Sequence, residues 1–115
     1  MQELAQLHCS PITANTPWLG EREIGQLKAR LSGWKTHTKQ GELRLEKSFA
    51  FKDFRQALTF TNLIAQLANE EDHHPAILTE WGKVTVTWWT HKIKGLHKND
   101  FIMAAKTEQA FGTSS

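Results

Sequence analysis

The chain has 115 residues, of which 39% are hydrophobic and 23% are charged, and its formal net charge is +2. This length predicts one domain with a core large enough to fold without metal or disulfide staples. The small charge, with basic and acidic residues mixed along the chain, gives no electrostatic footprint for nucleic acid, and no apolar run approaches the about 20 residues that span a bilayer.

The first residues carry little regular patterning. We expect residues 1–19 to form an irregular N-terminal arm and residues 20–115 to form a single domain. The opening stretch lacks the basic start and apolar core of a signal peptide. Cys9 is the sole cysteine, so no internal disulfide can form, and the expected location is cytoplasmic.

The segment 20–51 predicts a helix followed by a β-hairpin. Residues 20–31 have apolar side chains at helical spacing, acids early and bases late, and Ser32–Gly33 ends the helix. Residues 34–51 alternate in polarity and turn at Gln40–Gly41. Apart from the interruption at Lys47, one face of the second arm of this hairpin carries Leu43, Leu45, Phe49 and Phe51.

The strongest helical pattern begins at Asp53 and continues to about Asn69. Asp53 is a favourable N-cap, and Gln56 three residues later completes a capping box. The helix has a wide apolar stripe, suited to lying across a sheet, made of Ala57, Phe60, Leu63, Ile64, Leu67 and Ala68. Pro75 forbids any continuation, because its ring disfavours helical geometry at His74.

Two strands and a helix follow. A short strand is expected around residues 77–80, and residues 83–91 predict a longer one. The longer strand has Val84, Val86 and Trp88 on one face and Thr85, Thr87, Trp89 and His91 on the other. Asn99 or Asp100 is expected to cap the last helix. The order α-β-β-α-β-β-α predicts an α+β fold, a four-stranded antiparallel sheet with three helices on one face. Exposed edge strands favour self-association.

The motif DHHP places His73 and His74 side by side at a helix-to-strand junction, where polar side chains can point into a cleft. His91 ends the following strand, and Asp100 begins the last helix. Because an imidazole titrates near neutrality, three of them with a carboxylate would form an acid/base centre if the chain brings these element ends together.

Other interpretations compete with this one. An isolated histidine is usually surface or polar fill, the interpretation given to His8, His37 and His97, and Asp100 by itself is most often a helix-cap acid. Trp34, Trp81, Trp88 and Trp89 are typical core or interface aromatics, although any of them could stack on a flat heterocycle. A metal site is the chemical rival, but the HExxH spacing and a cysteine pair are missing. No GxSxG nucleophile motif or glycine-rich phosphate cradle occurs.

The stretch from Glu71 to Asp100, EDHHPAILTEWGKVTVTWWTHKIKGLHKND, closely resembles the signature of the pterin-4a-carbinolamine dehydratases. The matching parts are His73-His74-Pro75, Trp81, Thr90-His91 and Asp100. The likeness extends through FAFKDFRQALTF, and Trp34 stands where family members carry a tryptophan before the hairpin. It covers roughly residues 20–110. Family members often carry a glutamate where this chain has Asn69, which can keep a hydrogen bond but not a negative charge.

The resemblance implies a four-stranded antiparallel sheet with three helices, a homodimer or homotetramer, and an activity without metal or organic cofactor. The implied reaction is loss of water from 4a-hydroxytetrahydropterin to give quinonoid dihydropterin, which recycles the pterin of aromatic amino-acid hydroxylases. It implies His73, His74 and His91 as the acid/base set, with His74 or His91 protonating the departing hydroxyl. The supporting residues would be Asp100, which orients an imidazole, Trp34, which borders the pterin plane, Pro75 and Thr90.

A second hypothesis from another functional class uses the same fold as a non-catalytic assembly or dimerisation module. Such a module would be expected to have lost one or more of the three histidines, and this chain keeps all of them. The sequence therefore favours catalysis.

Overall fold

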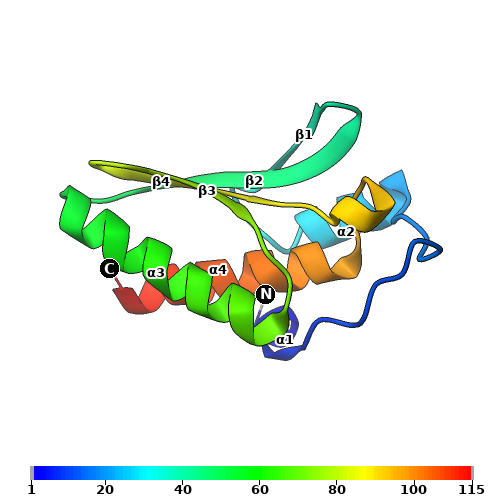
Figure 1. The fold of residues 1–115 in the computed structure, drawn as a ribbon, viewed down its shortest axis with the longest axis horizontal. Coiled ribbons are helices and arrows are strands. Elements are labelled where there is room, and N and C mark those ends of the chain that lie inside the picture. Colours follow the sequence, from blue (N-terminus) through cyan, green and yellow to red (C-terminus); the bar gives the residue numbers. More distant parts are fainter. Residues whose placement is uncertain (1, 115) are drawn as a thin grey trace.

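The protein, described over residues 2–114 by a computed structural model, is an antiparallel sheet with its helices on one side (Figure 1). The sheet order is β1-β2-β4-β3, and α3 and α4 run beneath the strands. The elements are α1 (Gln2–Gln6), α2 (Glu21–Lys28), β1 (Lys35–Lys39), β2 (Glu42–Ala50), α3 (Phe54–Glu71), β3 (Ala76–Glu80), β4 (Lys83–Trp88), the 3-10 helix η1 (His91–Ile93) and α4 (Lys98–Ser114). The predicted α+β class and element order are confirmed, with α1 as an additional helix.

The β1–β2 hairpin turns where the sequence predicts. Gln40 and Gly41 both adopt left-handed backbone conformations, with φ of 56° and 77°. Two consecutive positive φ angles match the right-handed twist of the flanking strands, so the register runs outward from Lys39 opposite Glu42. β2 then pairs with β4 from Leu45 opposite Trp88 onward, which places β4 in the interior of the sheet.

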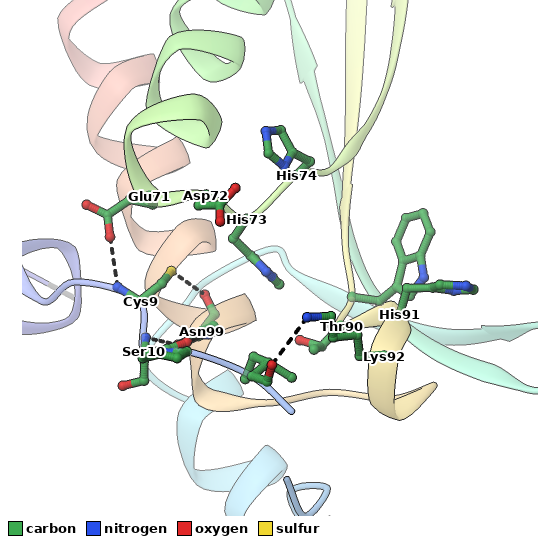
Figure 2. A pocket seen from close by; sticks show the side chains of 13 residues that line it. Cys9, Ser10, Glu71, Asp72, His73, His74, Thr90, His91, Lys92 and Asn99 are labelled. Atoms are coloured by element: carbon green, nitrogen blue, oxygen red, sulfur yellow. Dashed lines mark hydrogen bonds between the residues drawn. The ribbon is translucent and has the colours of Figure 1, made fainter. Parts of the chain in front are cut away.

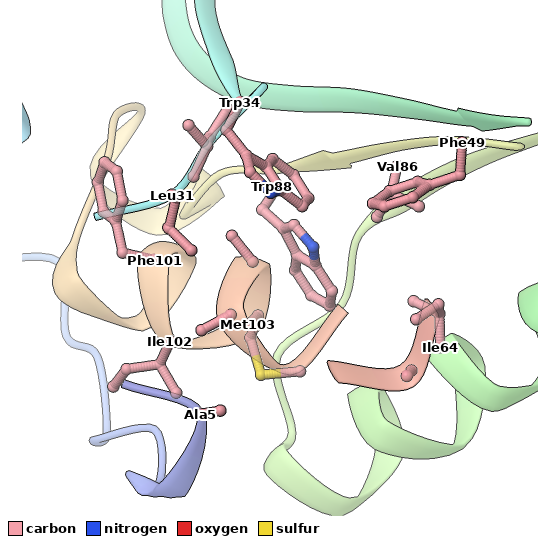
Figure 3. Close-up of a cluster of buried hydrophobic side chains, with 14 of the residues drawn as sticks. Ala5, Leu31, Trp34, Phe49, Ile64, Val86, Trp88, Phe101, Ile102 and Met103 are labelled. Carbon is pink, nitrogen blue, oxygen red and sulfur yellow. The ribbon is translucent and has the colours of Figure 1, made fainter. Parts of the chain in front are cut away.

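The core fills the space between the sheet and α3 and α4 (Figure 3). Val84, Val86 and Trp88 are fully buried, as the alternating pattern of β4 predicts. The Trp88 indole Nε1 donates to the Thr107 hydroxyl of α4 at 3.1 Å, so burial leaves no unpaired donor there. The predicted stripe of α3 is buried at Ala57, Phe60, Ile64 and Ala68.

Two boundaries differ from the sequence prediction in ways that matter for the pocket. The strand predicted over residues 83–91 ends at Trp88, and His91 begins η1. The cause is a tight loop: Thr90 N donates to Gly95 O at 2.9 Å, and Lys94 adopts a left-handed φ of 54°. At the other junction α3 continues to Glu71 instead of about Asn69, and its C-cap Asp72 reverses the chain with a left-handed φ of 52°.

The N-terminal residues are more ordered than the sequence suggests. Residues 2–6 form α1 within the predicted irregular arm, and Leu4 is only 1% exposed. Lys106 of α4 donates from Nζ to Ala5 O at 2.8 Å. A helix of five residues is unstable alone and shows no full apolar period, so packing on α4 forms it. None of the helices between residues 2 and 114 is long and apolar enough to cross a membrane.

The start of α4 depends on a histidine. The helix begins at Lys98, so the N-cap is His97, although Asn99 or Asp100 was predicted. His97 Nδ1 accepts from Asn99 N at 3.0 Å, while Asp100 Oδ2 accepts from His97 N at 2.9 Å. These two bonds form a reciprocal capping box, and the Asp100 carboxylate is thereby held at the head of the helix.

We expect His97 to make the stability of the fold sensitive to mild acid. Burial lowers the pKa of His97 below its usual 6.5, and protonation of Nδ1 would break the cap. Its contribution is therefore complete above pH 6.5 and is lost as the pH falls below that value, because the unfolded chain takes up the proton first.

His97→Asn should keep the cap without titrating. Thermal unfolding measured from about pH 7.5 to about pH 5.5 should show a larger fall in Tm for the parent than for this variant. Parallel falls would show that the imidazole does not act as a cap.

Candidate active site

A pocket of about 410 Å³ opens where the ends of several elements meet (Figure 2). Its lining comes from residues 9–12 of the N-terminal segment, residues 71–74 at the end of α3, residues 89–92 after β4, and Asn99 of α4. The size suits a small organic ligand. His73, His74 and His91, distant along the chain, all line it.

The most buried of the three imidazoles is paired with a carboxylate. His73 Nε2 lies 2.6 Å from Asp100 Oδ1, and Asp100 is 0% exposed. Asp100 Oδ2 accepts from Thr90 Oγ1 at 2.8 Å and from His97 N at 2.9 Å. The His73 ring is stacked on Trp88, with centroids 5.8 Å apart and planes 9° apart. Donation from Nε2–H to Asp100 leaves Nδ1 as the basic nitrogen of the neutral ring.

His74 is held in a different way. It is exposed, and its Nε2 lies 3.0 Å from Asn69 Oδ1. An amide oxygen only accepts, so the imidazole donates here. Asn69, a neutral group two residues before the end of α3, therefore accepts the hydrogen bond expected at this position.

His91 stands at the rim, with its side chain 78% exposed. Its Nδ1 lies 3.0 Å from Oε1 of Glu42, the first residue of β2. Arg44 extends from the same strand, 3.9 Å from the Glu42 carboxylate, and its guanidinium stacks on the Trp89 ring at 3.8 Å. The Arg44 guanidinium, itself stacked on Trp89, thus helps to hold the Glu42 carboxylate in place. Because His91 bonds Glu42 through Nδ1, its Nε2 is the nitrogen that can exchange a proton.

Each imidazole therefore has its own acceptor, and among the residues that the structure describes no hydrogen bond joins two of the three rings. Within residues 2–114, no three His, Cys, Asp or Glu side chains gather in a way that would hold a metal ion.

The Cys9 thiol also lines the pocket, but burial, together with the Glu71 carboxylate, raises its pKa to about 12. It is protonated at neutral pH and is no nucleophile. The arrangement is suited to moving protons to and from a bound molecule.

Three residues of the predicted site lie outside the pocket lining. Asp100 stands behind His73, and Pro75 turns the chain into β3. Trp34 does not line this pocket either. It is 3% exposed, packs edge-on against Phe49, and donates from Nε1 to Glu108 Oε1 at 2.9 Å. Trp81 of the motif lies at the β3–β4 turn and is 71% exposed.

Sequence reasoning missed Glu42 and the N-terminal residues. Glu42 follows the hairpin turn, and no local motif marks it. The register that pairs Leu45 with Trp88 brings Glu42, three residues earlier, level with His91, three residues later. Only a known strand register would have revealed this pair.

The fold and the pocket together define a small α+β protein with a histidine-lined pocket. A family model described as pterin 4 alpha carbinolamine dehydratase matches residues 17–110. The chain belongs to this family.

Two solved structures resemble it. One is a transcriptional coactivator/pterin dehydratase from Brucella melitensis, 33% identical, with a TM-score of 0.74, covering 82% of this chain and 98% of its own. The other is a pterin dehydratase-like protein identified as a RuBisCO assembly factor in the alpha-carboxysome. It is 25% identical, with a TM-score of 0.59, covering 70% of this chain and 90% of its own.

The buried carboxylate gives a stability test. In Asp100→Asn one oxygen is replaced by an amide nitrogen that cannot accept, so either the His73 ring or both Thr90 and His97 lose their acceptor. We expect a loss of about 1–3 kcal/mol in the free energy of unfolding, measured by urea denaturation. Thr90→Val, which removes one donor but leaves the His97 bond to the same oxygen, should lose less. An Asp100→Asn protein as stable as the parent would contradict the assigned network.

Proposed function

We propose that the protein dehydrates 4a-hydroxytetrahydropterin to quinonoid dihydropterin and water, with His73, His74 and His91 as the acid/base set. The carrying observation is that these three imidazoles line one pocket, each with a hydrogen-bond acceptor of its own. Membership of the carbinolamine dehydratase family supports the substrate class.

The reaction needs one proton delivered and one removed. The bond from C4a to the hydroxyl oxygen breaks as that oxygen receives a proton and leaves as water. The ring nitrogen N5 loses its proton, and its electron pair forms the C4a–N5 double bond. A protonated imidazole can supply the first proton and a neutral one can take the second, so the protons balance and no oxidant is needed.

The geometry supports a division of roles among the three imidazoles. His73, with Nε2–H donated to buried Asp100, presents Nδ1 as a base in a fixed orientation. His74 and His91 stand more exposed, and either is placed to protonate the departing hydroxyl. Thr90 and Asp100 act as positioning residues through His73, and Glu42 does so through His91.

The proposal extends to the cellular role. We propose a cytoplasmic homodimer or homotetramer that regenerates the pterin used by aromatic amino-acid hydroxylases. The single cysteine and the edge strands β1 and β3 support the compartment and the self-association.

A non-catalytic assembly role is the second candidate, favoured by the likeness to the RuBisCO assembly factor. A fold by itself does not define an activity. Assembly alone would not require the three histidines to line one pocket with fitted acceptors, and on this ground we place catalysis first. A direct assay separates the two roles.

Stopped-flow measurement of carbinolamine breakdown tests the histidines. His74→Ala and His91→Ala should each lower the rate at least about 10²-fold, because each removes one proton-transfer group. Circular dichroism and Tm should stay near those of the parent, since both side chains are exposed.

His37→Ala is the matched control. This histidine lies on β1, bonds Glu46 at 3.3 Å and does not line the pocket, so its loss should leave the rate unchanged. If the two pocket variants dehydrated as fast as the parent, the catalytic assignment would be wrong.

A further inference from the structure

The N-terminal segment supplies part of the pocket although it precedes the residues that match the family model. Residues 9–12 line the pocket, whereas the family match begins at residue 17. We call residues 8–12 the pocket arm. Cys9 and Ser10 lie on one side of His73, and Thr90, His91 and Lys92 lie on the other (Figure 2).

One end of the pocket arm is bound to α3. The Glu71 carboxylate accepts from Cys9 N at 2.8 Å and pairs with His8 Nδ1 at 2.7 Å. Burial would raise the pKa of Glu71, but the bonds from Cys9 and His8, with Lys106 nearby, outweigh it and lower the pKa. Glu71 is therefore charged at neutral pH, two residues before His73.

The middle of the pocket arm is bound to α4. Asn99 accepts from Ser10 N at 2.9 Å through Oδ1 and donates to Ser10 O at 2.8 Å through Nδ2. This side chain pairs with the backbone as a neighbouring strand would, and Asn99 is only 2% exposed. Asn99 directly precedes Asp100, so one helix start holds both the arm and the carboxylate behind His73.

The far end of the arm reaches across to η1. Lys92 Nζ donates to Ile12 O at 3.4 Å, which links the arm to the residue after His91. Outside the arm, Leu4 is buried on one side and Leu19 N donates to Leu96 O at 3.0 Å on the other. Hydrogen bonds thus hold the arm at both ends and in the middle, and the arm forms one wall of the pocket.

We propose that the pocket arm is a substrate-contacting wall that strengthens binding of the reduced pterin, an inference that rests on the proposed function. The backbone donors of Cys9 and Ser10 are already used by Glu71 and Asn99. Pro11 and Ile12 also line the pocket and offer apolar surface to a ligand. The arm therefore contributes contact area to the flat ring and no proton.

Ile12→Ala tests this wall in the full-length protein. Loss of the apolar contact should raise KM for carbinolamine, and Kd for the stable probe 7,8-dihydrobiopterin, by about three- to tenfold. The value of kcat should stay within about twofold, because uniform binding affects KM alone. Calorimetry gives Kd independently of turnover.

Leu7→Ala is the matched control, a similar truncation in the same segment at a side chain 40% exposed and outside the pocket lining. It should leave KM, Kd and kcat unchanged. If the parent is active and Ile12→Ala matches it, or lowers kcat with KM unchanged, the wall is refuted while the proposed function stands. If the parent neither dehydrates carbinolamine nor binds the probe, the proposed function fails and the inference fails with it.

Discussion

The buried carboxylate of Asp100 is the interaction on which the site depends. With no exposure to solvent, it accepts from the His73 ring, the Thr90 hydroxyl and the His97 backbone, and so joins the end of α3, the end of β4 and the start of α4. A buried charge is tolerated only when hydrogen bonds replace the water it has lost. The requirement to satisfy this one group therefore fixes both the position and the tautomer of the central imidazole.

The other two imidazoles are also oriented by a hydrogen-bond acceptor, but they are more exposed to solvent. His91 is oriented by Glu42, which the Arg44 guanidinium accompanies, and exposed His74 by the neutral amide of Asn69. The three imidazoles differ in solvent access and in partner, and these differences suit them to unlike tasks in the proposed reaction, which needs both an acid and a base. Of the two similar structures, one is a coactivator/pterin dehydratase and the other is a RuBisCO assembly factor. The same fold can therefore serve different functions, and the functional argument must depend on the chemistry of the site.

The pocket is also more than the family core. The N-terminal segment contributes residues 9–12, and the groups that hold it, Glu71 and Asn99, are near neighbours of His73 and Asp100 in the chain. The end of α3 thus holds both Glu71, which binds the arm, and His73, and the start of α4 holds both Asn99, which binds the arm, and Asp100. Under the proposed function, a change in the arm would alter ligand binding without touching an imidazole.

The sequence by itself determined the local elements: the strand alternation that buries Val84 and Val86, the turn at Gln40–Gly41, and the cap at Asp53. These elements depend on periodicity and on hydrogen bonds between near neighbours, and both can be predicted from the sequence. The family motif also marked the histidines, whose meeting in one pocket only the fold could produce. Tertiary structure alone decided the Glu42–His91 pair and the burial of α1. It also decided that Trp34 lies in the core, because strand register and packing depend on contacts between residues far apart in sequence.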